Sequence, residues 1–287
     1  MLKSGIIYFG GKYKLLSDIL KIIPKDITAF HDVFAGAFNV GCNVNASTVY
    51  YNDINKEMCR LVKYISDTET DRLISEIDAR IAEFGLTPSG KEQYLKLREC
   101  YNETFSSLDL YILHIFSFCH GIRFNTEMKY NMPVGNGFFN DDIRSNLIKF
   151  SNRLKQMNIK FSSYSFNEYL DNISLADSDV LYFDPPYLIS QSTYNSQWGE
   201  SDERLLYSMI DNIANRGNRF ILSNVFYHKD NENEILKEFA SKYKVIHIKN
   251  IYTKRFCNSN TKKSNDTDEV IVTNISDIKR FSIKKLW

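Results

Sequence analysis

The sequence has no long apolar run, few cysteines and almost no net charge, and the first two absences exclude whole classes of protein. No stretch approaches the roughly 20 consecutive apolar residues that a membrane-spanning helix requires. The five cysteines are odd in number, widely scattered and without a C-x-x-C pair, which argues against a disulfide framework and a zinc site. Because the first residues carry no apolar signal core, we expect a cytoplasmic protein with no membrane partner.

The balance of charge is less informative, because phosphate binding depends on a local basic surface more than on the total. The formal net charge is +1, yet lysines are frequent between residues 3 and 25, and basic residues recur between 244 and 285. Taken singly, each of these side chains is typical of a solvated surface. With 287 residues, 43% of them hydrophobic, the chain can bury one substantial core and a smaller lobe, so we expect two domains.

Patterns of apolar residues predict an α/β fold that opens with a βαβ unit. A strand at 28–34, a tight turn and a helix at 40–45 precede a second strand at 47–53 and a helix at 56–65. The last two strands are joined by a polar loop without a helix, so we expect them to be antiparallel. The later strands are predicted at 179–183, 219–225, 244–251 and 268–275, with a helix at 231–243.

A mainly helical segment interrupts this alternation of strands and helices. Strand patterns fade between residues 70 and 158. Apolar residues recur there with helical spacing at 71–84, 91–103 and 108–119. We therefore expect a helical lobe inserted into the sheet-forming part of the chain.

The most informative motif is Asp184-Pro185-Pro186-Tyr187, which directly follows the strand at 179–183. Open α/β sheets bind ligands at the carboxyl ends of their strands. The two prolines fix the backbone and leave carbonyls to face a ligand, while aspartate offers an acceptor and tyrosine a flat stacking surface. The Asp184 carboxylate and the Pro185 carbonyl would hold the hydrogens of an aromatic exocyclic amine and aim its nitrogen at a methyl donor. The alternative is a cis-proline turn that closes the strand.

A second candidate site combines the turn at Phe34, Gly36 and Ala37 with Asp53, at the end of the second strand. Glycine permits close approach of the backbone to a ligand, and an acid about 20 residues beyond such a turn is where a ribose diol is bound. The turn lacks the G-x-G-x-x-G spacing, which disfavours a dinucleotide dehydrogenase. Taken alone, Asp53 is equally typical of the N-cap of the following helix.

The third candidate is the glycine-rich segment Tyr8-Phe9-Gly10-Gly11-Lys12. It is not a P-loop, because the required G-x-x-x-x-G-K-[ST] spacing is absent and a tyrosine follows the lysine. A nucleoside triphosphatase of that type is therefore excluded. A tight turn that presents Lys12 and an aromatic ring to a ligand carboxylate or adenine fits the pattern better.

The segments YFGGK, FAGAF, YYND and DPPY, in this order, resemble the Dam-type, alpha-group N6-adenine DNA methyltransferases, and the resemblance covers nearly the whole chain. It implies a Rossmann-like, mostly parallel, seven-stranded sheet with one antiparallel strand, formed by residues 1–60 and 164–287. It also implies a mainly helical target-recognition domain at 61–163. The implied cofactor is S-adenosyl-L-methionine, with S-adenosyl-L-homocysteine as product and no metal. The implied partner is double-stranded DNA, bound by a monomer or weak dimer.

The same resemblance assigns roles residue by residue. The flipped adenine would lie on Asp184, Pro185, Pro186 and Tyr187, and the cofactor ribose on Asp53. The rest of the implied cofactor pocket is Tyr8, Gly10, Gly11, Lys12, Phe34, Gly36, Ala37, Ser165, Phe166 and Asp184.

Within the insertion, residues 120–125 (HGIRFN) and 130–135 (YNMPVG) resemble the target-recognition hairpin of that family. Arginine can donate two hydrogen bonds to guanine O6 and N7, worth roughly 1–3 kcal/mol of discrimination, and lysine does not reproduce this geometry. We predict that Arg123 contacts a base, the alternative being a structural salt bridge. GATC is the predicted site, although Asn136 stands where many readers of GATC carry a basic residue. The predicted DNA contacts are His120, Arg123, Asn125, Met132, Pro133, Asn136, Lys254 and Arg255.

The implied reaction is methyl transfer to N6 of an adenine rotated out of the duplex, which requires neither a metal nor a covalent nucleophile. None of the five prolines precedes a cysteine, as the usual Pro-Cys nucleophile of cytosine C5 methylation would require. Two alternatives remain: a methyltransferase that acts on RNA adenine or protein glutamine, and a noncatalytic DNA-binding subunit of the same fold. The polar loop 253–267 is predicted either to clamp backbone phosphate or to be an ordinary surface loop.

Overall fold

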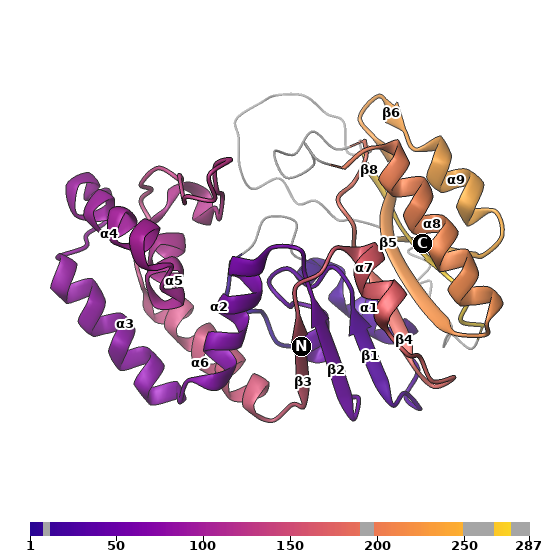
Figure 1. Ribbon diagram of the computed structural model, residues 1–287, viewed down its shortest axis with the longest axis horizontal. Helices are drawn as coiled ribbons and strands as arrows, with labels where there is room; N and C mark the ends of the chain where they lie inside the picture. Colours follow the sequence, from indigo (N-terminus) through magenta and orange to yellow (C-terminus); the bar gives the residue numbers. More distant parts are fainter. Residues whose placement is uncertain (8–11, 190–197, 249–266, 277–287) are drawn as a thin grey trace, which may run out of the picture.

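The computed structural model describes residues 1–7, 12–189, 198–248 and 267–276. In this part of the chain, eight strands form one sheet, drawn as arrows in Figure 1. The strands are β1 (Ala29–Asp32), β2 (Thr48–Asn52), β3 (Ile159–Ser162), β4 (Val180–Phe183), β5 (Arg219–His228), β6 (Asn231–Glu232), β7 (Lys244–Ile248) and β8 (Thr267–Thr273). The α-helices are α1 (Leu16–Ile22), α2 (Lys56–Asp67), α3 (Thr70–Phe84), α4 (Lys91–Thr104), α5 (Ser107–Phe116), α6 (Asp141–Lys155), α7 (Phe166–Asn172), α8 (Glu200–Asn215) and α9 (Glu234–Ala240).

The sheet is mostly parallel, with the strand order β3-β2-β1-β4-β5-β8-β7. The five strands β3, β2, β1, β4 and β5 run parallel to one another. Strand β8 runs antiparallel to both β5 and β7. The prediction of a mostly parallel sheet whose last two strands are antiparallel is therefore confirmed. The two-residue strand β6, which pairs with β5 outside this order, is an addition that the sequence did not indicate.

Helices cover both faces of the sheet, so that strand β4 is buried on either side (Figure 1). Successive side chains of a strand point to opposite faces. Leu181 and Phe183 accordingly join a core with residues of α7, α8 and α9. Val180 and Tyr182 join the core on the other face, which includes residues of α1 and α2. The DPPY motif thus follows a central strand that is held from both sides.

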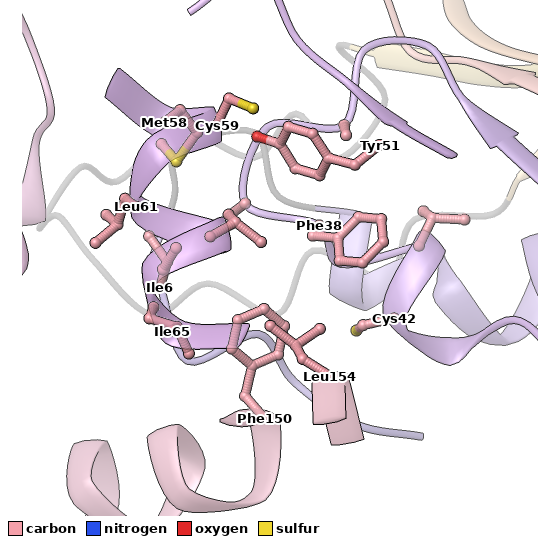
Figure 2. Close-up of a cluster of buried hydrophobic side chains, with 14 of the residues drawn as sticks. Ile6, Phe38, Cys42, Tyr51, Met58, Cys59, Leu61, Ile65, Phe150 and Leu154 are labelled. Atoms are coloured by element: carbon pink, nitrogen blue, oxygen red, sulfur yellow. The ribbon is translucent and has the colours of Figure 1, made fainter. Parts of the chain in front are cut away.

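The helices α2 to α6 lie between β2 and β3 along the chain, and α3 to α6 stand together beside the β3 end of the sheet (Figure 1). They share a hydrophobic core with the sheet. Phe150 and Leu154 of α6 belong to the same buried cluster as Met58 of α2 and Phe38 of the turn after β1 (Figure 2). The predicted domain boundary at residues 60 and 61 falls inside α2, and the division into two domains stays a prediction.

Some elements differ from the prediction for local reasons. The expected helix at 40–45 is only a 3-10 turn, η2 (Gly41–Asn43). Helix α5 ends at Phe116 because the next residue, Ser117, is extended (φ −78°, ψ 160°), and Cys119 and His120 beyond it have φ values of 53° and 52°, which a right-handed helix does not contain. Strand β3 and the helices α1, α6, α7 and α8 were not located from the sequence. None of the described helices is long and apolar enough to cross a membrane.

Candidate active site

The candidate residues meet at one edge of the sheet because β1, β2 and β4 are parallel neighbours. The carboxyl ends of parallel strands lie at the same edge, which is where open α/β sheets hold ligands. Asp32 ends β1, Asp53 follows β2, and Asp184 follows β4. The fold therefore brings together three carboxylates that are far apart in the sequence.

Asp53 is tied directly to the glycine turn, the other part of the second candidate site. Its Oδ2 accepts the Gly36 N–H at 2.7 Å, and its Oδ1 accepts the Asn55 N–H at 2.8 Å. Gly36 has a φ of 48°, in the left-handed region that glycine adopts without a Cβ clash. Burial raises the pKa of Asp53, and the two N–H donors offset part of this rise. The N-cap of α2 is Asn55, so the interpretation of Asp53 as the helix cap is wrong.

Lys12, Asp184 and Tyr187 form a compact cluster. Lys12 Nζ lies 2.9 Å from Asp184 Oδ1 and 4.7 Å from the centroid of the Tyr187 ring. The Tyr187 hydroxyl donates to the same Asp184 oxygen at 3.4 Å. Burial raises the pKa of Asp184, while the ammonium of Lys12 opposes this rise. Burial is the largest single influence on Lys12 and lowers its pKa, but the Asp184 carboxylate and its hydrogen bond, together with smaller contributions from Tyr182 and Glu269, leave the pKa raised, so the lysine stays cationic.

Asp32 belongs to this edge as well, and the sequence analysis gave it no role. Its Oδ2 accepts the Gly41 N–H at 3.0 Å, and its buried Oδ1 has no hydrogen-bond partner among the described residues. Burial raises the pKa of Asp32 to about 8, and repulsion from Asp184 and Asp53 adds to the effect. The available signal was an acid in the last position of a buried strand, four residues before Gly36.

We expect Asp32→Asn to change how the stability of the ligand-free protein depends on pH. The pKa of Asp32 is raised from its ordinary value of 3.8 to about 8 in the fold. Between these values the folded chain binds one proton more than the unfolded chain, so the free energy of unfolding falls as pH rises through this window. Asparagine does not titrate and keeps an acceptor for Gly41. The free energy of unfolding of Asp32→Asn relative to that of the wild type, measured by urea unfolding, should therefore be larger near pH 8 than near pH 5. A pH-independent difference would contradict the shift.

Tyr164 is a further residue of this edge that the sequence did not single out. The Asn52 side chain accepts the Tyr164 N–H at 3.0 Å and donates to the Tyr164 carbonyl at 3.0 Å. The Ser163 hydroxyl donates to the Asp53 carbonyl at 2.8 Å. These bonds hold the backbone of Tyr164 beside Asp53 and Ile54. The side chains of Tyr164 and Ile54 are exposed, by 54% and 69%. No local pattern indicates this placement, because Asn52 and Tyr164 are 112 residues apart.

The predicted pair Ser165 and Phe166 lies next to this position but faces the protein. Ser165 is the N-cap of α7 and forms a capping box with Glu168. Phe166 is buried and packs against Phe34 and Trp198, with ring centroids 5.9 Å and 5.5 Å away. Phe34 in turn contacts Trp198 at 5.9 Å. Phe34 and Phe166 are therefore neighbours, in an aromatic group that also holds Trp198.

The predicted recognition segment forms a hairpin that begins after α5. The bridge between Phe124 and Tyr130 pairs its two strands. Arg123 is exposed, and its guanidinium donates to Asn131 through Nε to Oδ1 at 2.8 Å and through Nη2 to the backbone oxygen at 3.2 Å. No salt bridge of Arg123 occurs among the described residues, so the structural ion pair considered as its alternative is absent there. The hairpin thus fixes the direction of an exposed guanidinium.

The other predicted hairpin residues are placed differently. Asn125, Pro133 and Asn136 are exposed, whereas His120 and Met132 are half-buried. The Asn125 side chain accepts the N–H groups of residues 127 and 129 and so stabilises the turn itself. The remaining predicted residues Tyr8, Gly10, Gly11, Lys254 and Arg255, like most of the loop 253–267, lie outside the described part of the chain.

A mostly parallel sheet with β8 reversed between β5 and β7, whose carboxyl edge gathers a glycine turn, an acid and a DPPY motif, is typical of the α/β methyltransferase class. The sequence pattern of the D12 class N6 adenine-specific DNA methyltransferases matches residues 8–254. The chain belongs to this family, as its motifs indicated.

Comparison with individual proteins gives the same family. The chain is 36% identical over 283 residues to modification methylase StsI of Streptococcus sanguinis, a match that covers 95% of this chain and 43% of that protein. It is 35% identical over 284 residues to type II methyltransferase M.FokI of Planomicrobium okeanokoites, with 96% and 43% covered. It is 26% identical over 191 residues to the DNA adenine methylase of Escherichia coli strain K12, with 65% of each chain covered. The chain spans less than half the length of the first two relatives.

Proposed function

We propose that the chain transfers a methyl group from S-adenosyl-L-methionine to N6 of an adenine in double-stranded DNA. One observation carries this proposal: Asp184 and Tyr187 of the DPPY motif form one cluster with Lys12, at the same sheet edge as the Gly36–Asp53 pair. Membership of the D12 class supports adenine N6 in DNA as the acceptor. For this reaction, the sheet edge must bind two ligands side by side: an adenosine-containing methyl donor and the adenine that accepts the methyl group.

The residues around Asp53 fit the donor. The cofactor supplies a methyl group made electrophilic by a sulfonium. Asp53 would accept from the ribose hydroxyls, since carboxylate oxygens have lone pairs beyond the one that each N–H donor uses. The exposed side chains of Ile54 and Tyr164 would enclose the nucleobase, and the turn at Gly36 and Ala37 lets the ligand approach the backbone. The buried, unpartnered oxygen of Asp32 suits a site built for a cationic ligand.

The residues of DPPY fit the acceptor. The Asp184 carboxylate and the Pro185 carbonyl would accept the two hydrogens of N6, which concentrates the nitrogen lone pair toward the donor. Tyr187 would stack on the base, a contact worth roughly 1–3 kcal/mol that offsets much of the few kcal/mol spent on base flipping. Lys12 holds the Asp184 carboxylate in place before adenine arrives. Catalysis then rests on positioning and polarisation.

The hairpin fits duplex DNA, and we propose Arg123 as a base-contacting residue, held by Asn131. GATC is the first site to test, because the Dam-type motifs indicate it. Asn136 and the higher identity to type II modification methylases leave the recognition sequence to be mapped. We place the reaction in the cytoplasm and expect a monomer or weak dimer.

Transfer of tritiated methyl from labelled cofactor tests this proposal. We expect label on a GATC-containing duplex or on plasmid DNA, with N6-methyladenine as the only modified base. The same sequence as RNA and a bulk protein fraction should stay unlabelled. Label on RNA or protein alone would establish the rival acceptors, and no transfer despite DNA binding would establish a noncatalytic subunit. Single-molecule sequencing of the methylated plasmid then gives the recognition sequence.

A further inference from the structure

We infer that Asp32 makes the cofactor site discriminate the cationic methyl donor from its product, because the empty site holds a proton on Asp32 that a bound sulfonium expels. This inference rests on the proposed function and deepens it. It concerns how the charge at the sheet edge is balanced before and after the donor binds.

The three carboxylates of this edge differ in how well their charges are compensated. Asp53 accepts two backbone N–H groups, and Asp184 has the ammonium of Lys12 at 2.9 Å together with the Tyr187 hydroxyl. Asp32 is only 2% exposed and has a single N–H donor, from Gly41, at 3.0 Å. Its second oxygen is buried without a partner among the described residues. A proton is therefore most favourable on Asp32.

The acidic groups whose charges would act on Asp32 if they ionised are Asp53 after β2, Asp184 after β4, the Cys42 thiol in η2 and, from the opposite face of β1, the Tyr169 hydroxyl on α7, which is hydrogen-bonded to His31. Burial lowers the pKa of His31 to about 4, so this neighbour stays neutral. Burial raises the pKa values of Cys42 and Tyr169 well above neutrality, so these two stay uncharged. No cation among the described residues is paired with Asp32: Lys12 is paired with Asp184, and Arg153 of α6 donates to the carbonyl oxygens of Cys42 and Val44. The positive charge that would stabilise ionised Asp32 has to come from a ligand.

The pKa of about 8 places this proton in the physiological range. The carboxyl oxygen is itself buried, so the ligand acts through its electric field rather than through contact. When the sulfonium donor binds, the proton passes from Asp32 to solvent buffer, and one negative charge then faces the bound cation. Methyl transfer leaves S-adenosyl-L-homocysteine, which has no sulfonium charge, and Asp32 takes a proton back from solvent. The site then favours exchange of the product for a new donor.

Reciprocity between proton and ligand binding gives the measurable consequence. A ligand whose binding releases one proton binds about tenfold more tightly for each unit of rising pH, as long as Asp32 starts protonated. A ligand that releases none keeps a constant affinity. The ratio of the product and donor dissociation constants should therefore rise about tenfold between about pH 6.5 and pH 7.5 and level off above the pKa of Asp32.

Calorimetric titration in two buffers of different ionisation enthalpy counts the protons. With the full chain we expect close to one more proton released by S-adenosylmethionine than by S-adenosylhomocysteine near neutral pH. Asp32→Asn should bind both ligands with equal proton counts and a flat affinity ratio. Asp177→Asn, the same exchange at the exposed residue before β4, should behave as the wild type.

The outcomes separate this inference from the proposed function. Binding of both ligands with equal proton release in the wild type, or an unchanged difference in Asp32→Asn, would overturn the role of Asp32 and leave the methyltransferase assignment standing. Failure of both ligands to bind would overturn both. If Asp32→Asn does not fold, the pH profile of the wild-type affinity ratio decides alone, since a flat profile refutes the inference.

Discussion

Replacing Asp184 with asparagine should slow methyl transfer by about 10²–10³-fold, the range found when one preorganised polar contact to a reacting centre is removed. Asparagine presents an N–H group where one carboxylate oxygen stood, so N6 loses an acceptor and meets a donor. It also removes the counter-ion of Lys12, whose ammonium lies 2.9 Å from Asp184 and is nearly buried. The nitrogen lone pair is then no longer directed, and the ion pair between Lys12 and residue 184 is lost.

Single-turnover rates on a saturating duplex measure this effect on the chemical step. Asp177→Asn, at the opposite end of β4, is the matched control, because it makes the same exchange at an exposed position. Tyr187→Phe keeps the stacking ring and should stay near the wild-type rate, whereas Tyr187→Ala should lose most of the activity. Circular dichroism and cofactor binding establish that each variant is folded. A folded Asp184→Asn protein with the wild-type rate would refute the assignment of the DPPY motif.

The parts of the site that could be predicted depend on short-range rules. A strand that ends in DPPY and a glycine turn followed by an acid each predict a position at the carboxyl edge of the sheet, and parallel pairing brings such positions together. This reasoning placed Gly36 and Asp53 in one site, and the hydrogen bond between them is direct. It also named Lys12 and Asp184 for the cofactor pocket, with Asp184 for the flipped adenine as well, and the two form an ion pair.

The parts that could not be predicted depend on contacts between distant segments. Tyr164 lies beside Asp53 because the Asn52 amide holds its backbone, and nothing in the residues near Tyr164 indicates that bond. The sequence placed Asp32 in a buried strand and indicated no role for it. Only the fold brings it close enough to Asp53 and Asp184 for their charges to raise its pKa. Strand β3 lies at the edge of the sheet and is only half-buried, so it gives no continuous apolar run, yet it carries Tyr164 to the site. The predicted helix at 40–45 is only the 3-10 turn η2, because Val44 is already extended (φ −87°, ψ 141°).

Replacing Arg123 with lysine should relax the choice of one base pair by roughly 1–3 kcal/mol, because lysine keeps the charge but not the two parallel N–H donors that match guanine. The geometry supports a fixed guanidinium: Asn131 accepts Nε and Nη2, and the hairpin bridge between Phe124 and Tyr130 keeps Asn131 opposite Arg123. Asn131→Ala keeps Arg123 but removes the side-chain acceptor that orients its guanidinium. It should therefore cause a smaller loss of discrimination at the same base pair.

Relative rates on duplexes that each differ by one base pair from the mapped site distinguish the possible roles of Arg123. Loss of discrimination at a single position identifies a base contact, which is the expected result. A uniform loss at every position, together with a weaker dependence of binding on salt, would instead identify a phosphate contact. Unchanged rates on all duplexes would leave Arg123 only the task of holding Asn131 in the hairpin, and the predicted recognition element would have to be sought on another surface.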